Sequence, residues 1–264
     1  MKIIKPKKSL GQNFLIDKNI INTIINAGNI NENDVVLEVG PGTGSLTEKI
    51  LTKSPKKIFV VEKDKILANK LKGKFNEKLI VINEDILKID EKKTFNEPMI
   101  VFGNLPYNIS TQILIKWIRL NSLNKTFKKF ILMFQKEVAE RIIATTNERN
   151  YGRLAILASW RMDTKKIADV SPNSFYPRPK VKSTILLVEP KTEYFNFKNS
   201  RNLEHITNIF FNQRRKKIKK PLALLFKNAE EISKKLNINV NDRPQNLPIS
   251  KYIELCNEYE KSAF

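Results

Sequence analysis

Three of the chain's eight glycines fall within five residues, Gly40, Gly42 and Gly44, in the string EVGPGTGSLT. An apolar run at 35–39 precedes them, and a helical pattern at 45–53 follows. A glycine-rich turn between a buried strand and a helix lets the backbone approach a ligand closely. The pattern therefore predicts a binding site for a nucleotide-type ligand.

Acidic residues follow the next two apolar runs. Glu62 lies 22 residues after Gly40 and suits the two hydroxyls of a ribose, and Asp85 in NEDIL can accept from an adenine amino group. The glycine spacing is one residue short of the dinucleotide pattern G-x-G-x-x-G, and Glu38 before the turn suits a cationic ligand better than a phosphate. Because S-adenosylmethionine carries a sulfonium and an ammonium group, the acidic lining favours it over a dinucleotide.

A second motif, Asn104, Leu105, Pro106 and Tyr107, follows the apolar run at 99–102. The exocyclic amine of adenine is a poor nucleophile because its lone pair is delocalised into the ring. The side-chain oxygen of Asn104 and a backbone carbonyl at Leu105 or Pro106 would localise that lone pair by accepting the two amine hydrogens. Pro106 stiffens the turn, and Tyr107 offers a ring on which an extruded base can stack. Taken alone, the tetrapeptide also fits an ordinary turn with no chemical role. In combination with the glycine turn earlier in the sequence, it predicts methyl transfer to adenine.

Alternating strand and helix patterns must position these motifs. Asp17 is predicted to cap a first helix, and further helices are expected around 45–53, 64–74 and 111–120. The predicted strands lie at 35–39, 57–62, 79–82, 99–102, 129–134, 165–170 and 183–188. This alternation predicts an α/β fold with a mostly parallel sheet covered on both faces, forming a domain over residues 1–190.

After Pro190 the pattern is helical alone, so a small all-helical domain is expected over residues 191–264. Its predicted helices lie at 201–213, 221–228, 230–238 and 249–260. This part carries six cations within seven residues, a density that favours contact with an RNA backbone. The members of this Arg214–Lys220 cluster are Arg214, Arg215, Lys216, Lys217, Lys219 and Lys220.

The charge balance and the scarce residue types narrow the function classes. The 264 residues include 48 Lys and Arg against 27 Asp and Glu, a net charge of +21, which favours a polyanionic partner, although AT-rich coding also enriches lysine. Lys2, Lys5, Lys7 and Lys8 form a basic N-terminal arm that either orders over the cofactor when RNA arrives or stays disordered.

Cysteine and histidine occur once each, as Cys256 and His205. A single cysteine allows no intrachain disulfide, and a single histidine makes a zinc site or a Ser-His-Asp system implausible, so no metal is expected. His205 is expected on the surface of a helix. No signal peptide or membrane span is predicted, so the protein is expected to be soluble and cytoplasmic. It is also expected to be monomeric.

Nine strings, the two motifs among them, follow one another from residue 7 to residue 217, within a match that covers about residues 7–250. In order, they are KKSLGQNFLID, EVGPGTGSLT, VVEKD, NEDIL, GNLPYNIST, QKEVAERI, YGRL, FYPRPKVKS and FNQRRKK. Together they closely resemble the motifs of the small-subunit rRNA adenine N6,N6-dimethyltransferase family. The resemblance implies a class I, Rossmann-like methyltransferase fold that uses S-adenosylmethionine. It also implies dimethylation of two adjacent adenosines near the 3′ end of 16S rRNA, on a partly assembled small ribosomal subunit.

The resemblance also implies roles for individual residues. Those at the target amine are Asn104, Pro106, Tyr107 and Phe175, the last as an aromatic ring closing over the flipped base. Those at the cofactor are Asn13, Leu15, Gly40, Glu62, Asp85 and Asn104. Two positions depart from the family pattern, Lys182 where an acidic residue is common and Pro221 after FNQRRK.

Three alternative functions remain open. Macrolide-resistance methyltransferases of large-subunit rRNA share the core and a related Asn-x-Pro-Tyr segment, but Leu105, QKEVAERI and FNQRRKK favour the small-subunit family. An N6-adenine DNA methyltransferase would use the same chemistry. A mainly non-catalytic ribosome assembly factor would keep the fold alone, and the intact set of Gly40, Glu62, Asp85 and Asn104 argues against it.

Overall fold

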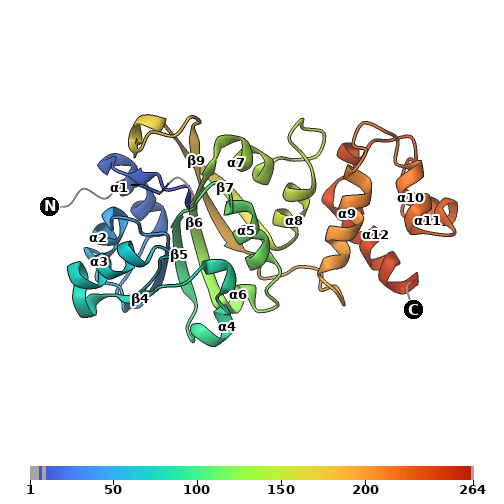
Figure 1. The fold of residues 1–264 in the computed structure, drawn as a ribbon. Helices are drawn as coiled ribbons and strands as arrows, with labels where there is room; N and C mark the ends of the chain where they lie inside the picture. Colours follow the sequence, from blue (N-terminus) through green and yellow to red (C-terminus); the bar gives the residue numbers. More distant parts are fainter. Residues whose placement is uncertain (1–5, 8–9, 263–264) are drawn as a thin grey trace. The chain divides into compact units, whose positions relative to one another are not determined.

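The computed structural model describes residues 6–7 and 10–262, and the chain divides into two compact units (Figure 1). The first unit combines Met1–Ala139 with Thr164–Pro190, and the second combines Glu140–Asp163 with Lys191–Phe264. Of the predicted basic arm, only Lys7 lies within the described residues.

A seven-stranded sheet forms the centre of the first unit, in the order β4-β3-β2-β5-β6-β9-β7. The strands are β2 (Val35–Val39), β3 (Lys57–Val61), β4 (Ile80–Ile82), β5 (Met99–Asn104), β6 (Phe127–Gln135), β7 (Met162–Val170) and β9 (Ser183–Pro190). The pairs β3–β4, β2–β3, β2–β5 and β5–β6 are parallel, whereas β9 runs antiparallel to β6. The predicted mostly parallel sheet is confirmed, and the β-branched runs of β2 and β3 match strands covered on both faces.

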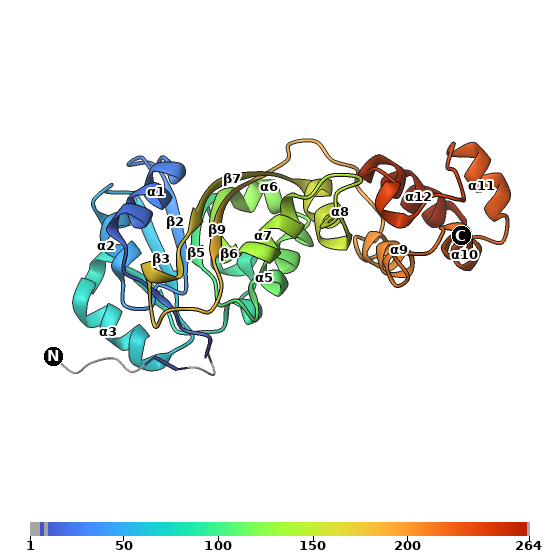
Figure 2. The same cartoon turned by 90° about the horizontal axis from the view of Figure 1, so that it is seen from above.

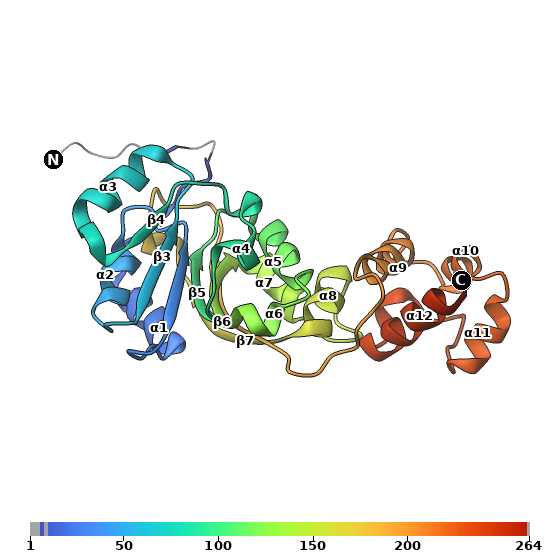
Figure 3. The same ribbon diagram turned by 90° about the horizontal axis from the view of Figure 1, so that it is seen from below.

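Helices cover both faces of this sheet (Figures 2 and 3). They are α1 (Lys18–Gly28), α2 (Ser45–Leu51), α3 (Lys65–Phe75), α4 (Glu91–Thr94), α5 (Ser110–Ile118), α6 (Leu123–Thr126) and α7 (Lys136–Ile143). The side chain of Asp17 accepts hydrogen bonds from two backbone N–H groups and caps α1, as predicted. Because the described helices are all too short or too polar, none could cross a membrane.

Alternating side chains of the strands build the two halves of the core. On one face, Phe102 and Val36 pack with apolar residues of α1, α2 and α3. A side chain at Gly28 would place its Cβ 2.3 Å from the Phe102 ring, so the glycine lets α1 approach the sheet. On the other face, Trp117 of α5 packs against Phe127 and Phe130, with ring centroids 5.7 and 5.1 Å apart. Packing on both faces therefore holds the strands in place, and with them the carboxyl ends of the parallel strands.

The second unit is helical, as predicted, but it begins earlier in the chain. Its helices are α8 (Arg153–Arg161), α9 (Arg201–Phe211), α10 (Lys219–Leu225), α11 (Ala229–Lys235) and α12 (Ile249–Ser262). Residues 140–163 were expected in the first domain but group with the second unit, because their aromatic side chains pack there. Trp160 donates to the Phe195 carbonyl at 2.8 Å, and the Tyr151 hydroxyl donates to the Leu247 carbonyl at 3.1 Å.

Candidate active site

The strand order brings four predicted cofactor residues to one edge of the sheet. β2 lies between β3 and β5, so the chain leaves β2 in one direction for β3 and β4 and later returns on the other side for β5. Ligands bind at such a switch point, beyond the carboxyl ends of the strands. Gly40, Glu62, Asp85 and Asn104 come from the ends of four parallel strands and line one cavity. The same cavity is lined by Asn13, Leu15, Pro106 and Tyr107.

The glycine turn contributes two positions without side chains, Gly40 and Gly42, to the cavity wall. Gly40, Gly42 and Gly44 have φ values of +70°, +57° and +84°, in the left-handed region that favours glycine. A Cβ at Gly42 would also lie 2.8 Å from the Phe14 ring. A substitution at Gly42 would therefore strain the backbone and displace the segment that carries Phe14.

The two strand-end carboxylates are held differently. Glu62 is only 6% exposed and accepts from the Asp64 N–H at 2.8 Å and from the Gly42 N–H at 3.2 Å. Burial raises the pKa of Glu62 above its ordinary value, although these N–H groups oppose the shift. For Asp85, burial also raises the pKa, but the Lys63 ammonium at 2.8 Å and the Leu87 N–H outweigh it, so the pKa lies below its usual range. The pair thus presents acceptor oxygens in a fixed orientation.

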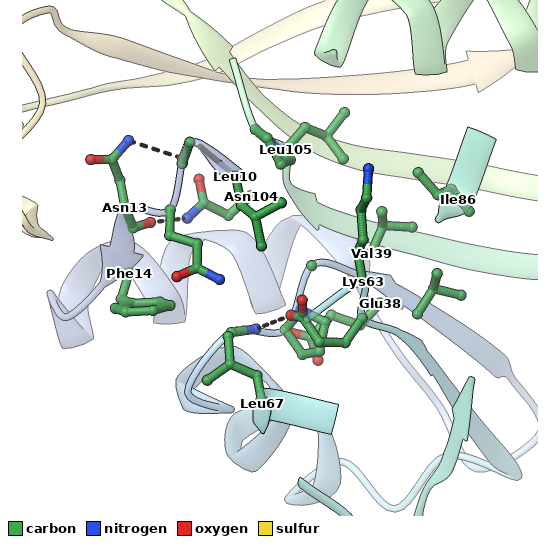
Figure 4. Close-up of a pocket in the computed structure, with 18 of the residues that line it drawn as sticks. Leu10, Asn13, Phe14, Glu38, Val39, Lys63, Leu67, Ile86, Asn104 and Leu105 are labelled. Atoms are coloured by element: carbon green, nitrogen blue, oxygen red, sulfur yellow. Dashed lines mark hydrogen bonds between the residues drawn. The ribbon is translucent and has the colours of Figure 1, made fainter. Parts of the chain in front are cut away.

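Lys63 is a site residue that the sequence analysis did not single out. It lines the cavity (Figure 4). It also forms an ion pair with Asp85. The available signal was its position directly after Glu62, at the carboxyl end of β3. Gln12 was missed in the same way; it lines the cavity and donates to the Asp64 carboxylate at 3.2 Å.

Asn104 has a fixed amide orientation. Its Nδ2 donates to the Asn13 carbonyl at 2.8 Å, so its Oδ1 remains as an acceptor (Figure 4). The Pro106 carbonyl already accepts from the N–H groups of Ile109 and Ser110, at 3.1 and 3.0 Å, where α5 begins. Of the two backbone carbonyls predicted to bind the target amine, Pro106 is therefore engaged in starting a helix.

Tyr107 is held by a hydrogen bond from another strand. Its hydroxyl lies 2.6 Å from the Oγ of Ser183, a fully buried residue at the start of β9. Burial raises the pKa of Tyr107, and the Ser183 hydrogen bond opposes this shift. The phenol is therefore neutral at physiological pH and anchored at its polar end.

Phe175 does not lie at the cavity. It is 3% exposed and packs in the hydrophobic core, because β8 (Phe175–Tyr176) pairs with β1 (Phe14–Leu15) and alternate strand residues face opposite sides. Its register partner is Leu15, so Phe175 supports the segment that carries Asn13 and Leu15. This buried position does not agree with the predicted stacking of Phe175 on a flipped base. The neighbouring Tyr176 is 55% exposed.

The model of the ribosomal RNA adenine dimethylase family matches residues 3–261. The chain belongs to this family. Ribosomal RNA small subunit methyltransferase A of Pelagibacter ubique (strain HTCC1062) is 53% identical over 257 residues, covering 97% of this chain and 98% of the relative. The enzyme of the same name from Ehrlichia ruminantium (strain Gardel) is 43% identical over 263 residues, covering 97% of each.

Two solved structures share the fold of the dimethylase. A dimethyladenosine transferase from Plasmodium falciparum superposes with a TM-score of 0.80 at 28% identity, covering 95% of this chain and 98% of its own. The 23S rRNA methyltransferase ErmE superposes with a TM-score of 0.71 at 22% identity, covering 93% and 98%. These likenesses confirm the class I methyltransferase fold.

The dimethylase is an S-adenosylmethionine-dependent enzyme that methylates adenine in ribosomal RNA. The chemistry of its cavity fits that cofactor, because the carboxyl groups of Glu38, Glu62 and Asp85 line it and the glycine turn leaves room beside them. Within the described ranges, no three metal-ligating side chains are grouped so that they could hold an ion.

The Arg214–Lys220 cluster lies in the segment that follows α9 and in the first two residues of α10. Five of its six cations are exposed, but Arg214 is half-buried. The Arg214 guanidinium donates to the Arg149 carbonyl at 2.8 Å and to the Gln245 side chain at 3.1 Å. Arg214 therefore holds two segments of the second unit together, which the sequence pattern did not reveal.

The buried Glu38 predicts a pH-dependent stability for the cofactor-free dimethylase. Burial raises its pKa from 4.5 to about 8, although the Thr47 hydroxyl donates to it at 2.6 Å. Between these two pH values, the folded state keeps a proton on Glu38 that the unfolded state has lost. The stabilising contribution of Glu38 to the free energy of unfolding is therefore complete below pH 4.5 and is lost as the pH rises through 8. The slope approaches about 1.4 kcal/mol per pH unit.

Glu38→Gln is expected to remove this slope and to raise the free energy of unfolding above the wild-type value at pH 9. Urea denaturation at pH 6 and pH 9 measures the difference. The control is Glu97→Gln, whose carboxylate is exposed and paired with Lys56, at the amino ends of the strands. An unchanged pH dependence in Glu38→Gln would contradict the assignment.

Proposed function

We propose that this dimethylase transfers methyl groups to N6 of two adjacent adenosines near the 3′ end of 16S rRNA, within a partly assembled small ribosomal subunit. The observation that carries the proposal is the meeting of Asn104 with Gly40, Glu62 and Asp85 in one cavity. The small-subunit target is supported by the names of relatives that match along their whole length. We further propose that the enzyme acts as a monomer in the cytoplasm.

The cavity residues divide into a cofactor wall and a target wall. We assign Glu62 to the ribose hydroxyls and Asp85 to the adenine amino group of the cofactor, with Asn13, Leu15 and Gly40 completing that wall. When bound, S-adenosylmethionine supplies an electrophilic methyl group on its sulfonium. Hydrogen bonds from hydroxyl and amino groups to charged carboxylates are worth about 1.5–3 kcal/mol each, so these two acceptors dominate the polar recognition.

On the target wall, Asn104 orients the amine. Its Nδ2 is held by the Asn13 carbonyl, so its Oδ1 is free to accept one amine hydrogen. We assign the second hydrogen to the Leu105 carbonyl, because Pro106 uses its own carbonyl to begin α5. Tyr107 stacks on the extruded base, with its hydroxyl anchored by Ser183. Orientation and electrostatics then provide the acceleration without a strong general base.

The second unit is assigned to rRNA binding through the exposed members of the Arg214–Lys220 cluster. These are Arg215, Lys216, Lys217, Lys219 and Lys220. Their charges suit phosphate contacts, which strengthen binding regardless of sequence and weaken with added salt. Arg214 shapes this surface from within through its hydrogen bonds to Arg149 and Gln245.

Transfer of a tritiated methyl group to isolated ribosomal particles tests the proposed function. Unmethylated small subunits are expected to accept label at two adjacent adenosines near the 3′ end of their rRNA. Large subunits and duplex DNA serve as controls and are expected to remain unlabelled. Label entering only large subunits would instead favour the macrolide-resistance type of activity, and label entering none of the three would favour a non-catalytic assembly factor.

A further inference from the structure

The loop between β8 and β9, residues 177–182, carries a concentration of positive charge in the first unit. Arg178, Lys180 and Lys182 are all exposed, and their side chains form no ion pair or hydrogen bond with a described residue. No acidic residue occurs from 171 to 188. Asp169, which contacts Thr184 at the start of β9, forms its ion pairs with Lys136 and Lys166 instead of with these three cations.

Exposed apolar side chains lie among these charges. Tyr176, just before the loop, is 55% exposed, and Val181 within it is 44% exposed. An exposed aromatic ring among cations is the combination that binds single-stranded nucleic acid, because bases stack on the ring while phosphates contact the cations. A partner recognised by charge alone would not require the exposed ring.

The loop is fixed beside the target wall of the cavity at both ends. At its start, the β1–β8 pair joins Tyr176 to Phe14, which lines the cavity. At its end, Ser183 lies 2.6 Å from the Tyr107 hydroxyl, and the Lys182 carbonyl accepts from the Lys136 N–H at 3.0 Å. Pro177 and Pro179 each fix a backbone φ angle, which limits the conformations of the loop.

We propose that this loop binds the rRNA strand immediately flanking the target adenosine, with its three cations on successive phosphates and Tyr176 stacked on a neighbouring base. The inference rests on the proposed function, since the loop matters only if Tyr107 receives the target base. A strand whose base is extruded against Tyr107 must pass next to the segment to which Tyr107 is bonded. The cationic loop is that segment.

The triple variant Arg178→Gln, Lys180→Gln, Lys182→Gln tests the proposal. Three lost phosphate contacts are expected to raise the KM for small subunits about tenfold or more at moderate salt and to reduce the slope of log affinity against log salt by about 2. The rate at saturating small subunits and the affinity for S-adenosylmethionine are expected to stay within about threefold of wild type.

The matched control removes the same charge elsewhere in the first unit. Lys53, Lys57 and Lys125 are exposed and lie at the amino ends of the strands, away from the cavity, and their triple change to glutamine is expected to leave KM and the salt slope near wild type. Tyr176→Leu is expected to raise KM about fivefold or more, and Tyr176→Phe to restore it, because phenylalanine retains the stacking ring.

The outcomes separate this inference from the proposed function. If the loop variant matches the control variant while wild type methylates small subunits, the loop proposal is overturned and the function stands. If wild type methylates no small subunits, the proposed function fails first. If the loop variant raises the Kd for S-adenosylmethionine as strongly as the KM for RNA, the loop is a structural support of the cavity, and the proposal is likewise overturned.

Discussion

Asn104→Ala is expected to lower the single-turnover rate of adenine methylation by about 10²–10³-fold, the loss typical when one preorganised polar group is removed from a reacting centre. The alanine removes the Oδ1 acceptor that we assign to the target amine. It also removes the Nδ2 donor to the Asn13 carbonyl, so a smaller loss of cofactor affinity is expected in addition. Rapid-quench methyl transfer with saturating cofactor measures the rate alone.

Asn124→Ala is the matched control for Asn104→Ala. Asn124 is exposed in α6, outside the residues that line the cavity, and its side chain makes no hydrogen bond to a described residue, so a change of less than about threefold is expected. A normal rate in Asn104→Ala would show that the amine is oriented by other groups and would contradict the mechanism proposed above.

Glu62→Gln is expected to weaken S-adenosylmethionine binding by about 10- to 150-fold, which corresponds to one charge-assisted hydrogen bond of about 1.5–3 kcal/mol. The size of the side chain is preserved, but one carboxylate oxygen becomes an NH2 group that faces the N–H of Gly42 or Asp64. The loss therefore combines a weaker acceptor for the ligand with a disturbed glycine turn. Isothermal titration calorimetry measures the Kd directly.

The control for Glu62→Gln is again Glu97→Gln, at the opposite edge of the sheet, which is expected to bind the cofactor like wild type. The melting temperature of both variants, measured without cofactor, separates a binding defect from a folding defect. A Glu62→Gln variant that is stably folded and keeps a Kd within about threefold of wild type would remove Glu62 from the cofactor wall.

The sequence predicted those features whose information lies in contiguous stretches. Hydrophobic periodicity located the strands of the parallel sheet and the helices after Pro190. The spacing of Gly40, Gly42 and Gly44 indicated a turn with left-handed backbone angles, which these three residues adopt. The residues at strand ends could be predicted to meet because parallel strands share one carboxyl edge. Motif resemblance further indicated the family before any tertiary contact was known.

Long-range packing decided the rest. α8 was not predicted, because residues 154–158 are all buried. Their sequence shows no amphipathic pattern by which a helix could be told from a buried strand. The extension of the second unit to residues 140–163 follows from contacts such as that of Trp160 with Phe195, across about 35 positions of sequence.

The roles of individual side chains were likewise decided by tertiary contacts. Phe175 packs in the core because its strand pairs with Leu15, about 160 residues away, and Arg214 is held by distant segments of the second unit. The sequence by itself determined the fold class, the cofactor motif and the family. Only the tertiary structure decided which aromatic and basic side chains face a ligand and which support the fold, because that choice depends on partners brought together from distant positions in the chain.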